Sequence, residues 1–122
     1  NQDILATLAA LVGTHVPDNQ AMDSNNLLPL FTGDGTFQKR DVFLQQAGLQ
    51  CEVMVRKMPY KLIMQSDQKR SHFTPTKLFN LRDDPHEDTN LLEQPSYHPI
   101  AQSLLSEYKN VIESKRSTVP GH

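Results

Sequence analysis

The chain has 122 residues, of which 37% are hydrophobic and 21% are charged, and its net charge at pH 7 is −2. This length fits one domain, and the scattered charges form neither an acidic tail nor a basic surface, so nucleic-acid binding is not expected. The single cysteine, Cys51, excludes an internal disulfide, and the longest apolar stretch, residues 4–12, is far shorter than the about 20 residues that span a membrane.

The N-terminal region predicts a helix followed by a short helical turn. Apolar side chains recur at helical spacing over residues 4–12, with Asp3 placed to cap the first turn and Gly13 to end the last. A polar loop follows. Asn26 is then a suitable cap for a helical turn over residues 27–30, where a proline in the first turn removes no intrahelical hydrogen bond.

The middle of the chain predicts an antiparallel sheet. Short apolar-rich runs separated by turn-forming residues are typical of strands. They cover residues 42–46, 50–56, 60–65 and 77–81. In the second run Cys51, Val53 and Val55 alternate with polar or larger residues, the period of two expected when one sheet face is buried. The first three runs have short connections and favour hairpins, whereas residues 66–76 are expected to form a longer polar loop.

The last element is an amphipathic helix expected over residues 99–115, followed by a fraying end. Its apolar stripe consists of Ile100, Leu104, Tyr108, Val111 and Ile112, and its wet face of Gln102, Glu107, Lys109 and Glu113. The order helix, strands, helix predicts an α+β fold: a small antiparallel sheet of about four strands, a C-terminal helix packed on one face, and an N-terminal helix. We expect one domain, with residues 1–40 forming the first helix and a connecting segment and residues 41–122 forming the sheet and last helix.

Four stretches carry recognisable motifs. The most specific is residues 77–91, K-L-F-N-L-R-D-D-P-H-E-D-T-N-L, which fills every fixed position of the pattern L-[YF]-x-L-x-x-D-P-x-E-x-x-N-L. Residues 60–63 read Y-K-L-I, residues 3–8 read D-I-L-A-T-L, and residues 23–30 read D-S-N-N-L-L-P-L. In this order the stretches resemble the C-terminal third of sulfatases of the alkaline phosphatase superfamily.

The departures from the family pattern are small. Ala6 stands where the family has proline, Ser24 where it has glycine, and Asn26 where it has serine. The resemblance implies a sulfatase C-terminal subdomain cut away from its larger N-terminal catalytic domain, which would be its partner and would hold calcium and the formylglycine nucleophile. It also implies a sulfated small molecule or sugar as substrate of the intact enzyme, and a periplasmic, secreted or lysosomal location.

The resemblance assigns no catalytic residue and no metal ligand to this chain. The family makes formylglycine within [CS]-x-[PA]-[SA]-R, and the residues that follow Cys51 do not match this pattern, nor do those that follow any serine. We therefore expect Cys51 to be a small buried hydrophobic residue on a strand. A carboxylate cluster (Asp83, Asp84, Glu87 and Asp88) lacks the spacing of an EF-hand, so we interpret it as a solvated turn. Within it, Asp84 is expected to accept a hydrogen bond from the backbone of His86.

One loop is a candidate for substrate binding. Lys69, Arg70 and His72 lie together between two predicted strands. Lysine and arginine bind sulfate oxygens as they bind phosphate, and loops on a rigid sheet commonly carry recognition residues. The alternative is a solvated hairpin loop whose charges affect only solubility.

Three functions remain open from the sequence. The first is a non-catalytic C-terminal portion of a sulfuric ester hydrolase, which completes the fold and can form one wall of the substrate cleft. The second is a free-standing interaction module. The third is the same portion of a related phosphate or phosphonate ester hydrolase.

Overall fold

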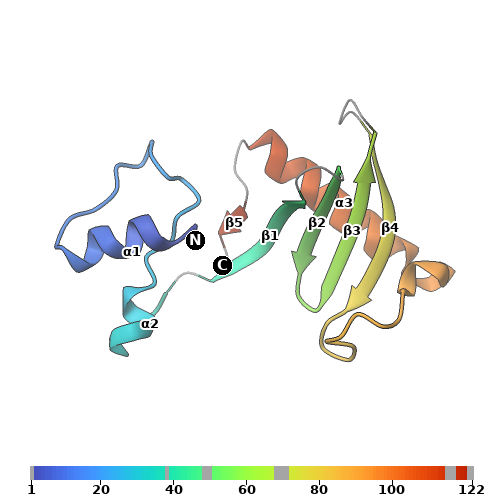
Figure 1. Ribbon diagram of the computed structural model, residues 1–122, viewed down its shortest axis with the longest axis horizontal. Coiled ribbons are helices and arrows are strands. Elements are labelled where there is room, and N and C mark those ends of the chain that lie inside the picture. The colour runs from blue at the N-terminus through green and yellow to red at the C-terminus, as the bar shows by residue number, and fades with distance from the viewer. Residues whose placement is uncertain (1, 38, 48–50, 68–71, 115–117, 121–122) are drawn as a thin grey trace. The chain divides into compact units, whose positions relative to one another are not determined.

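The computed structural model describes most of the chain and divides it into two compact units (Figure 1). The described residues are 2–37, 39–47, 51–67, 72–114 and 118–120. Asn1–Arg40 with Pro120–His122 form the first unit, which we call the N-terminal unit. Asp41–Val119 form the second, which we call the sheet unit.

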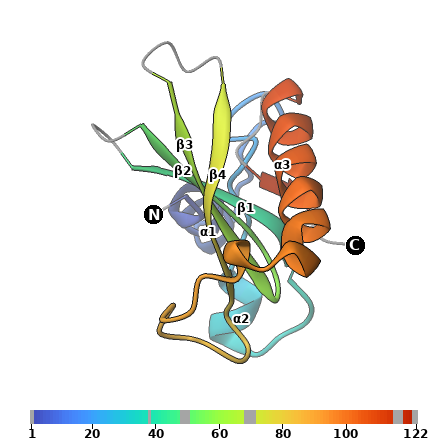
Figure 2. The same cartoon turned by 90° about the vertical axis from the view of Figure 1, so that its right-hand side faces the viewer.

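The sheet unit has an α+β fold. Its sheet has the strand order β4-β3-β2-β1-β5, and the pairs β1–β2, β2–β3 and β3–β4 are antiparallel. The strands are β1 (Arg40–Ala47), β2 (Glu52–Lys57), β3 (Tyr60–Ser66), β4 (Phe73–Asn80) and β5 (Thr118–Pro120). Helix α3 (His98–Glu113) lies along one face of the sheet (Figure 2). The predicted fold class is therefore confirmed, and the short strand β5 replaces part of the end that was expected to fray.

Strand β4 begins earlier than expected. The loop predicted over residues 66–76 is wrong, because β3 continues to Ser66 and β4 starts at Phe73. Pro75 lies within β4, which is the end strand of the sheet, where a residue without an N–H group is tolerated. A register shift beside Ile63 accompanies it, and the Thr76 hydroxyl donates to the Ile63 carbonyl at 3.1 Å.

The hydrophobic core of the sheet unit lies between the sheet and α3. Alternate strand residues point into it, as the period of two predicted for Val53 and Val55 requires. The buried cluster consists of Val42, Val53, Val55, Leu62, Met64, Leu78, Ala101, Leu104, Tyr108 and Val111. Two expectations are wrong: Cys51 is half-buried in the turn before β2 with φ of 52°, and Ile112 is 52% exposed.

Glu107 on α3 is also placed differently from the prediction. It was expected to face water, but it is half-buried and accepts a hydrogen bond from Lys57 Nζ at 2.5 Å. The same ammonium group lies 3.3 Å from Asp41 Oδ2. The hydrogen bond with Glu107 is the main cause that raises the pKa of Lys57 above its ordinary value. Glu107 therefore links α3 to the sheet through an ion pair.

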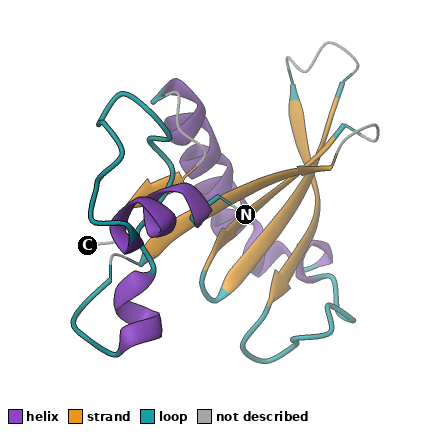
Figure 3. Ribbon diagram, turned by 60° about the vertical axis from the view of Figure 1, so that its left-hand side comes forward, coloured by secondary structure: helices purple, strands orange, loops and turns teal. Residues whose placement is uncertain are grey.

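The N-terminal unit contains two helices joined by a long loop (Figure 3). α1 covers Ile4–Leu11 and α2 covers Leu28–Thr32, close to the predicted ranges. Gly13 ends α1 as expected: its φ is 76°, and the N–H groups of Gly13 and Thr14 bond to the carbonyls of Ala10 and Ala9, the Schellman arrangement. Neither helix, both of which are fully described, contains a buried residue. Within the described part of the chain, no helix is long and apolar enough to cross a membrane.

Candidate functional site

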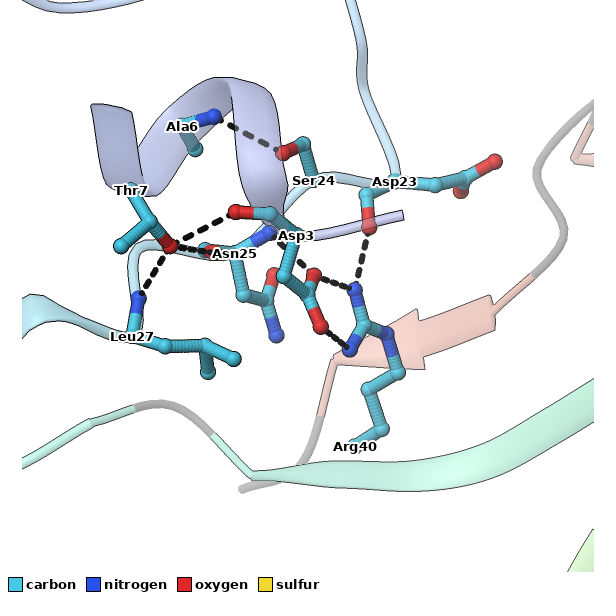
Figure 4. A network of polar contacts seen from close by, with 8 residues as sticks. All are labelled: Asp3, Ala6, Thr7, Asp23, Ser24, Asn25, Leu27 and Arg40. Atoms are coloured by element: carbon cyan, nitrogen blue, oxygen red, sulfur yellow. Dashed lines mark hydrogen bonds and ion pairs between the residues drawn. The ribbon is translucent and has the colours of Figure 1, made fainter. Parts of the chain in front are cut away.

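A network of polar contacts organises the N-terminal unit around Asp3 (Figure 4). Asp3 was expected to cap α1, but its carboxylate makes no capping bond. Instead, Asp3 binds both terminal nitrogens of Arg40, with Nη1 at 2.6 Å from Oδ2, and accepts the backbone N–H of Asn25 at 2.8 Å. Arg40 Nη2 also donates to the Asp23 carbonyl at 2.5 Å. The pair is mostly buried, with side-chain exposures of 15% for Arg40 and 19% for Asp3.

The electrostatics of this pair indicate a structural contact. The hydrogen bond from Arg40 is the largest cause that lowers the pKa of Asp3, while the same bond raises the pKa of Arg40. A carboxylate held in this way by a bidentate guanidinium is not available as a general base. Sequence reasoning missed Arg40, because nothing in its neighbourhood distinguishes it from a surface arginine.

Two further contacts join the motif of residues 3–8 to the motif of residues 23–30. The Thr7 hydroxyl accepts the N–H of Leu27 at 3.0 Å and donates to the Asp3 carbonyl at 2.6 Å. The Ser24 hydroxyl accepts the N–H of Ala6 at 3.0 Å. The two motifs therefore hold each other in place, through the side chains of Asp3, Thr7 and Ser24.

The motif of residues 77–91 forms a tight turn after β4. The Asp84 carboxylate accepts the backbone N–H groups of Asp88 at 3.0 Å and Thr89 at 2.9 Å, so the predicted bond from His86 is wrong. These bonds lower the pKa of Asp84, and the bond from the Thr89 N–H is the largest cause. Glu87, which lies between Asp84 and these two donors, adopts a positive φ of 62°.

Two residues of this motif bind the sheet. Glu87 accepts from Lys61 Nζ of β3 at 2.6 and 2.8 Å. Asn90, just before the short 3₁₀ helix Leu91–Glu93, bonds to the outer edge of β4: its Oδ1 accepts the N–H of Leu78 at 3.0 Å and its Nδ2 donates to the Thr76 carbonyl at 3.3 Å. β4 is the end strand, so Asn90 takes the place of a neighbouring strand at these two groups.

Three carboxylates of the cluster, those of Asp83, Asp84 and Glu87, accept hydrogen bonds from the protein. Besides the bonds of Asp84 and Glu87, Asp83 Oδ2 accepts from Asn80 Nδ2 at 2.6 Å. In the part of the chain that the structure describes, no group of His, Cys, Asp and Glu side chains is placed to hold a metal ion. The resemblance places the calcium of the intact enzyme in the N-terminal catalytic domain, so this finding does not bear on that expectation.

Of the predicted substrate-binding residues, Lys69 and Arg70 lie outside the described residues. His72 is described and lies just before β4, with its side chain 87% exposed. Its backbone pairs with Asp67: the Asp67 N–H donates to the His72 carbonyl at 3.1 Å, and the His72 N–H donates to Asp67 Oδ1 at 3.2 Å. His72 thus stands at the base of the β3–β4 hairpin loop, in contact with solvent.

A groove that sequence reasoning did not predict lies beside this hairpin. It has a volume of about 320 Å³ and runs between the strand ends and the last turns of α3. Its lining residues are Gln46, Val53, Ser66, Phe73, Tyr108, Lys109, Ile112 and Glu113. The rings of Phe73 and Tyr108 pack 4.7 Å apart at 57°, and burial raises the pKa of the Tyr108 hydroxyl. The residues that line the groove come from separate elements, so no local sequence pattern predicts this groove.

Comparison with known proteins finds a similar solved structure and a sequence relative. No family model matches the chain. The crystal structure of a phosphonate monoester hydrolase of Agrobacterium radiobacter is similar over 92% of this chain and 24% of that chain, with a TM-score of 0.62 and 22% sequence identity. The chain shares its fold with part of that hydrolase. An uncharacterized protein of Haemophilus influenzae is 28% identical over 121 residues, which cover 97% of this chain and 57% of that protein. The chain thus spans little more than half of the relative and about a quarter of the hydrolase.

Proposed function

We propose that this chain is the non-catalytic C-terminal portion of an ester hydrolase of the alkaline phosphatase superfamily, with sulfuric esters as the first candidate substrates. The observation that carries the proposal is the mutual bonding of the motif residues. Lys61 bonds to Glu87, and Asn90 bonds to β4. These residues of the family-like motifs therefore hold the fold together, which supports a structural role for the motifs.

In this proposal the chemistry takes place in the part of the longer polypeptide outside residues 1–122. The formylglycine nucleophile and calcium, which the sulfatase resemblance implies, belong to that part, and the residues here complete the fold and one wall of the substrate cleft. Lys69, Arg70 and His72 approach the substrate beyond its ester group. The missing catalytic domain is the partner of the chain, and a sulfated small molecule or sugar is the substrate. We propose an exported location for the intact enzyme.

A second candidate function is the hydrolysis of phosphonate or phosphate esters. The specific observation in its favour is the fold shared with part of a phosphonate monoester hydrolase. The two candidates need the same structural portion and differ only in the catalytic domain.

The experiment that tests the proposal assays the longer polypeptide encoded by the native gene on a chromogenic aryl sulfate and on a matched aryl phosphonate. Faster turnover of the sulfate supports the first candidate, and faster turnover of the phosphonate supports the second. A longer polypeptide that cleaves neither ester, nor an aryl phosphate, would refute both and favour an interaction module.

A further inference from the structure

The N-terminal unit exposes an unusual amount of apolar surface. The large apolar side chains of α1, such as Leu8 at 52% exposure, lie at least half in solvent, and Phe31 of α2 is 77% exposed. The exposed large apolar residues of this unit are Ile4, Leu5, Leu8, Leu11, Val12, Met22, Leu30, Phe31 and Phe37. Large exposed apolar patches mark interaction sites on folded proteins.

Part of this surface is a preformed groove. It has a volume of about 250 Å³ and lies between α1 and α2. Its lining residues are Asp3, Ile4, Thr7, Leu8, Leu27 and Phe31. The Thr7 hydroxyl and the Asp3 carboxylate, its polar groups, are already bonded to Leu27, Asn25 and Arg40. What remains for a ligand is therefore apolar, and the bonds that satisfy the polar groups also fix the separation of the two helices.

The chemistry of α1 argues against a lipid surface as the occupant. Helices that lie on membranes carry Lys and Arg on their polar face. α1 has the sequence I-L-A-T-L-A-A-L, without a charged side chain. A second copy of the chain fits poorly too, because a symmetric dimer would face one hollow with an identical hollow. An apolar protein segment that fills the groove satisfies both observations.

The two similar proteins indicate the source of such a segment, because both are longer than this chain. It spans 57% of one and 24% of the other. We propose that the groove between α1 and α2 is the docking site for an apolar segment of the same polypeptide that lies outside residues 1–122. The N-terminal unit then contributes its apolar residues to the core of a neighbouring domain. This inference rests on the proposed function only in requiring a longer polypeptide.

The test compares the same substitution in two lengths of the protein. Leu8→Gln in α1 and Phe31→Gln in α2 remove an apolar contact, and glutamine keeps a helix propensity close to that of leucine. The control is Met58→Gln in the β2–β3 turn, because Met58 is also exposed, at 56%, but belongs to the sheet unit. Each variant is made in the 122-residue chain and in the longer polypeptide, and its melting temperature is measured with its oligomeric state.

We expect Leu8→Gln and Phe31→Gln each to lower the Tm of the longer polypeptide by roughly 5 °C or more, and that of the 122-residue chain by less than about 1 °C. Met58→Gln should leave the Tm of both proteins unchanged. Equal losses in both lengths would show that the groove is filled from within residues 1–122, and a dimer that dissociates on Leu8→Gln would show that a second copy fills it. No loss in either length would show an empty groove. Each of these three results overturns the proposal. Ester hydrolysis is measured separately, so an inactive polypeptide with the expected Tm pattern refutes the proposed function alone.

Discussion

Lys61 Nζ of β3 lies 2.6 Å and 2.8 Å from the two carboxylate oxygens of Glu87 in the turn after β4. The two residues are separated by 26 positions in the chain and belong to two different motifs. Their side chains are only 21% and 30% exposed, so this pair is screened less than an ordinary surface pair. The contact fixes the turn of residues 84–90 against the sheet.

We predict that the Lys61–Glu87 pair contributes measurably to stability. Lys61→Ala and Glu87→Ala should each lower the free energy of unfolding by about 1 kcal/mol, and the double variant should lose less than the sum, with a coupling energy of about 0.5–1 kcal/mol. Urea denaturation of the four proteins in the cycle measures this coupling. Additive losses would mean that the two side chains do not interact in solution.

Asn90 should contribute to the stability of the sheet unit although it lies outside the strands. Asn90→Ala removes the acceptor of the Leu78 N–H and the donor to the Thr76 carbonyl. Leaving partly buried backbone groups without partners should lower the free energy of unfolding by about 2 kcal/mol. Asn110→Ala, at an exposed position of α3, is the matched control and should be neutral or slightly stabilising. Similar melting curves for the two variants would contradict the role given to Asn90.

Three substitutions in helix α3 should destabilise the sheet unit to different degrees. Leu104 is 3% exposed in the core, so Leu104→Asp buries a charge and should unfold the sheet unit. Glu107→Ala breaks the ion pair with Lys57 and should lower the free energy of unfolding by about 0.5–1 kcal/mol. Gln102→Ala, on the exposed side of the helix, should stay within about 0.5 kcal/mol of the wild type. Circular dichroism melts rank the three, and any other order would contradict this docking of α3.

The proposed role of the β3–β4 loop in substrate binding is tested in the longer polypeptide. If Lys69 and Arg70 contact the substrate beyond its ester group, the double variant Lys69→Ala/Arg70→Ala should raise KM several-fold for a sulfated sugar. It should leave KM for a small aryl sulfate unchanged, because the smaller molecule does not reach the loop. The same comparison with His72→Ala tests the third residue. Unchanged kinetics on both substrates would leave these charges as part of a solvated loop.

Local patterns predicted the elements of the fold that depend on local spacing. The alternation around Val53 and Val55 indicated a half-buried strand, and the stripe containing Leu104 indicated the buried side of α3; both are confirmed. The start of β4 was missed because Pro75 reads as a strand breaker unless its strand is known to lie at the sheet edge. Glu107 was misplaced because helical periodicity does not show that Lys57 of another element lies within reach.

The contacts that join the motifs could not be predicted from spacing. Asp3 and Arg40 are separated by 37 positions, and only the path of the intervening loop brings them together. The groove beside Phe73 and Tyr108 likewise depends on elements that are distant in the sequence, because residues of β1, β2, β3, β4 and α3 line it. The exposure of α1 was also missed, because an apolar stripe in a sequence does not tell whether the partner that covers it is in the same chain.

The central claim is that catalysis requires the part of the polypeptide outside residues 1–122. The most direct test compares ester hydrolysis by the 122-residue chain and by the longer polypeptide. The 122-residue chain and the longer polypeptide are each purified and assayed at equal concentration with a chromogenic aryl sulfate and an aryl phosphonate. We predict turnover of at least one ester by the longer polypeptide and none above background by the 122-residue chain. Turnover by the 122-residue chain alone, abolished by a substitution within it, would contradict the account.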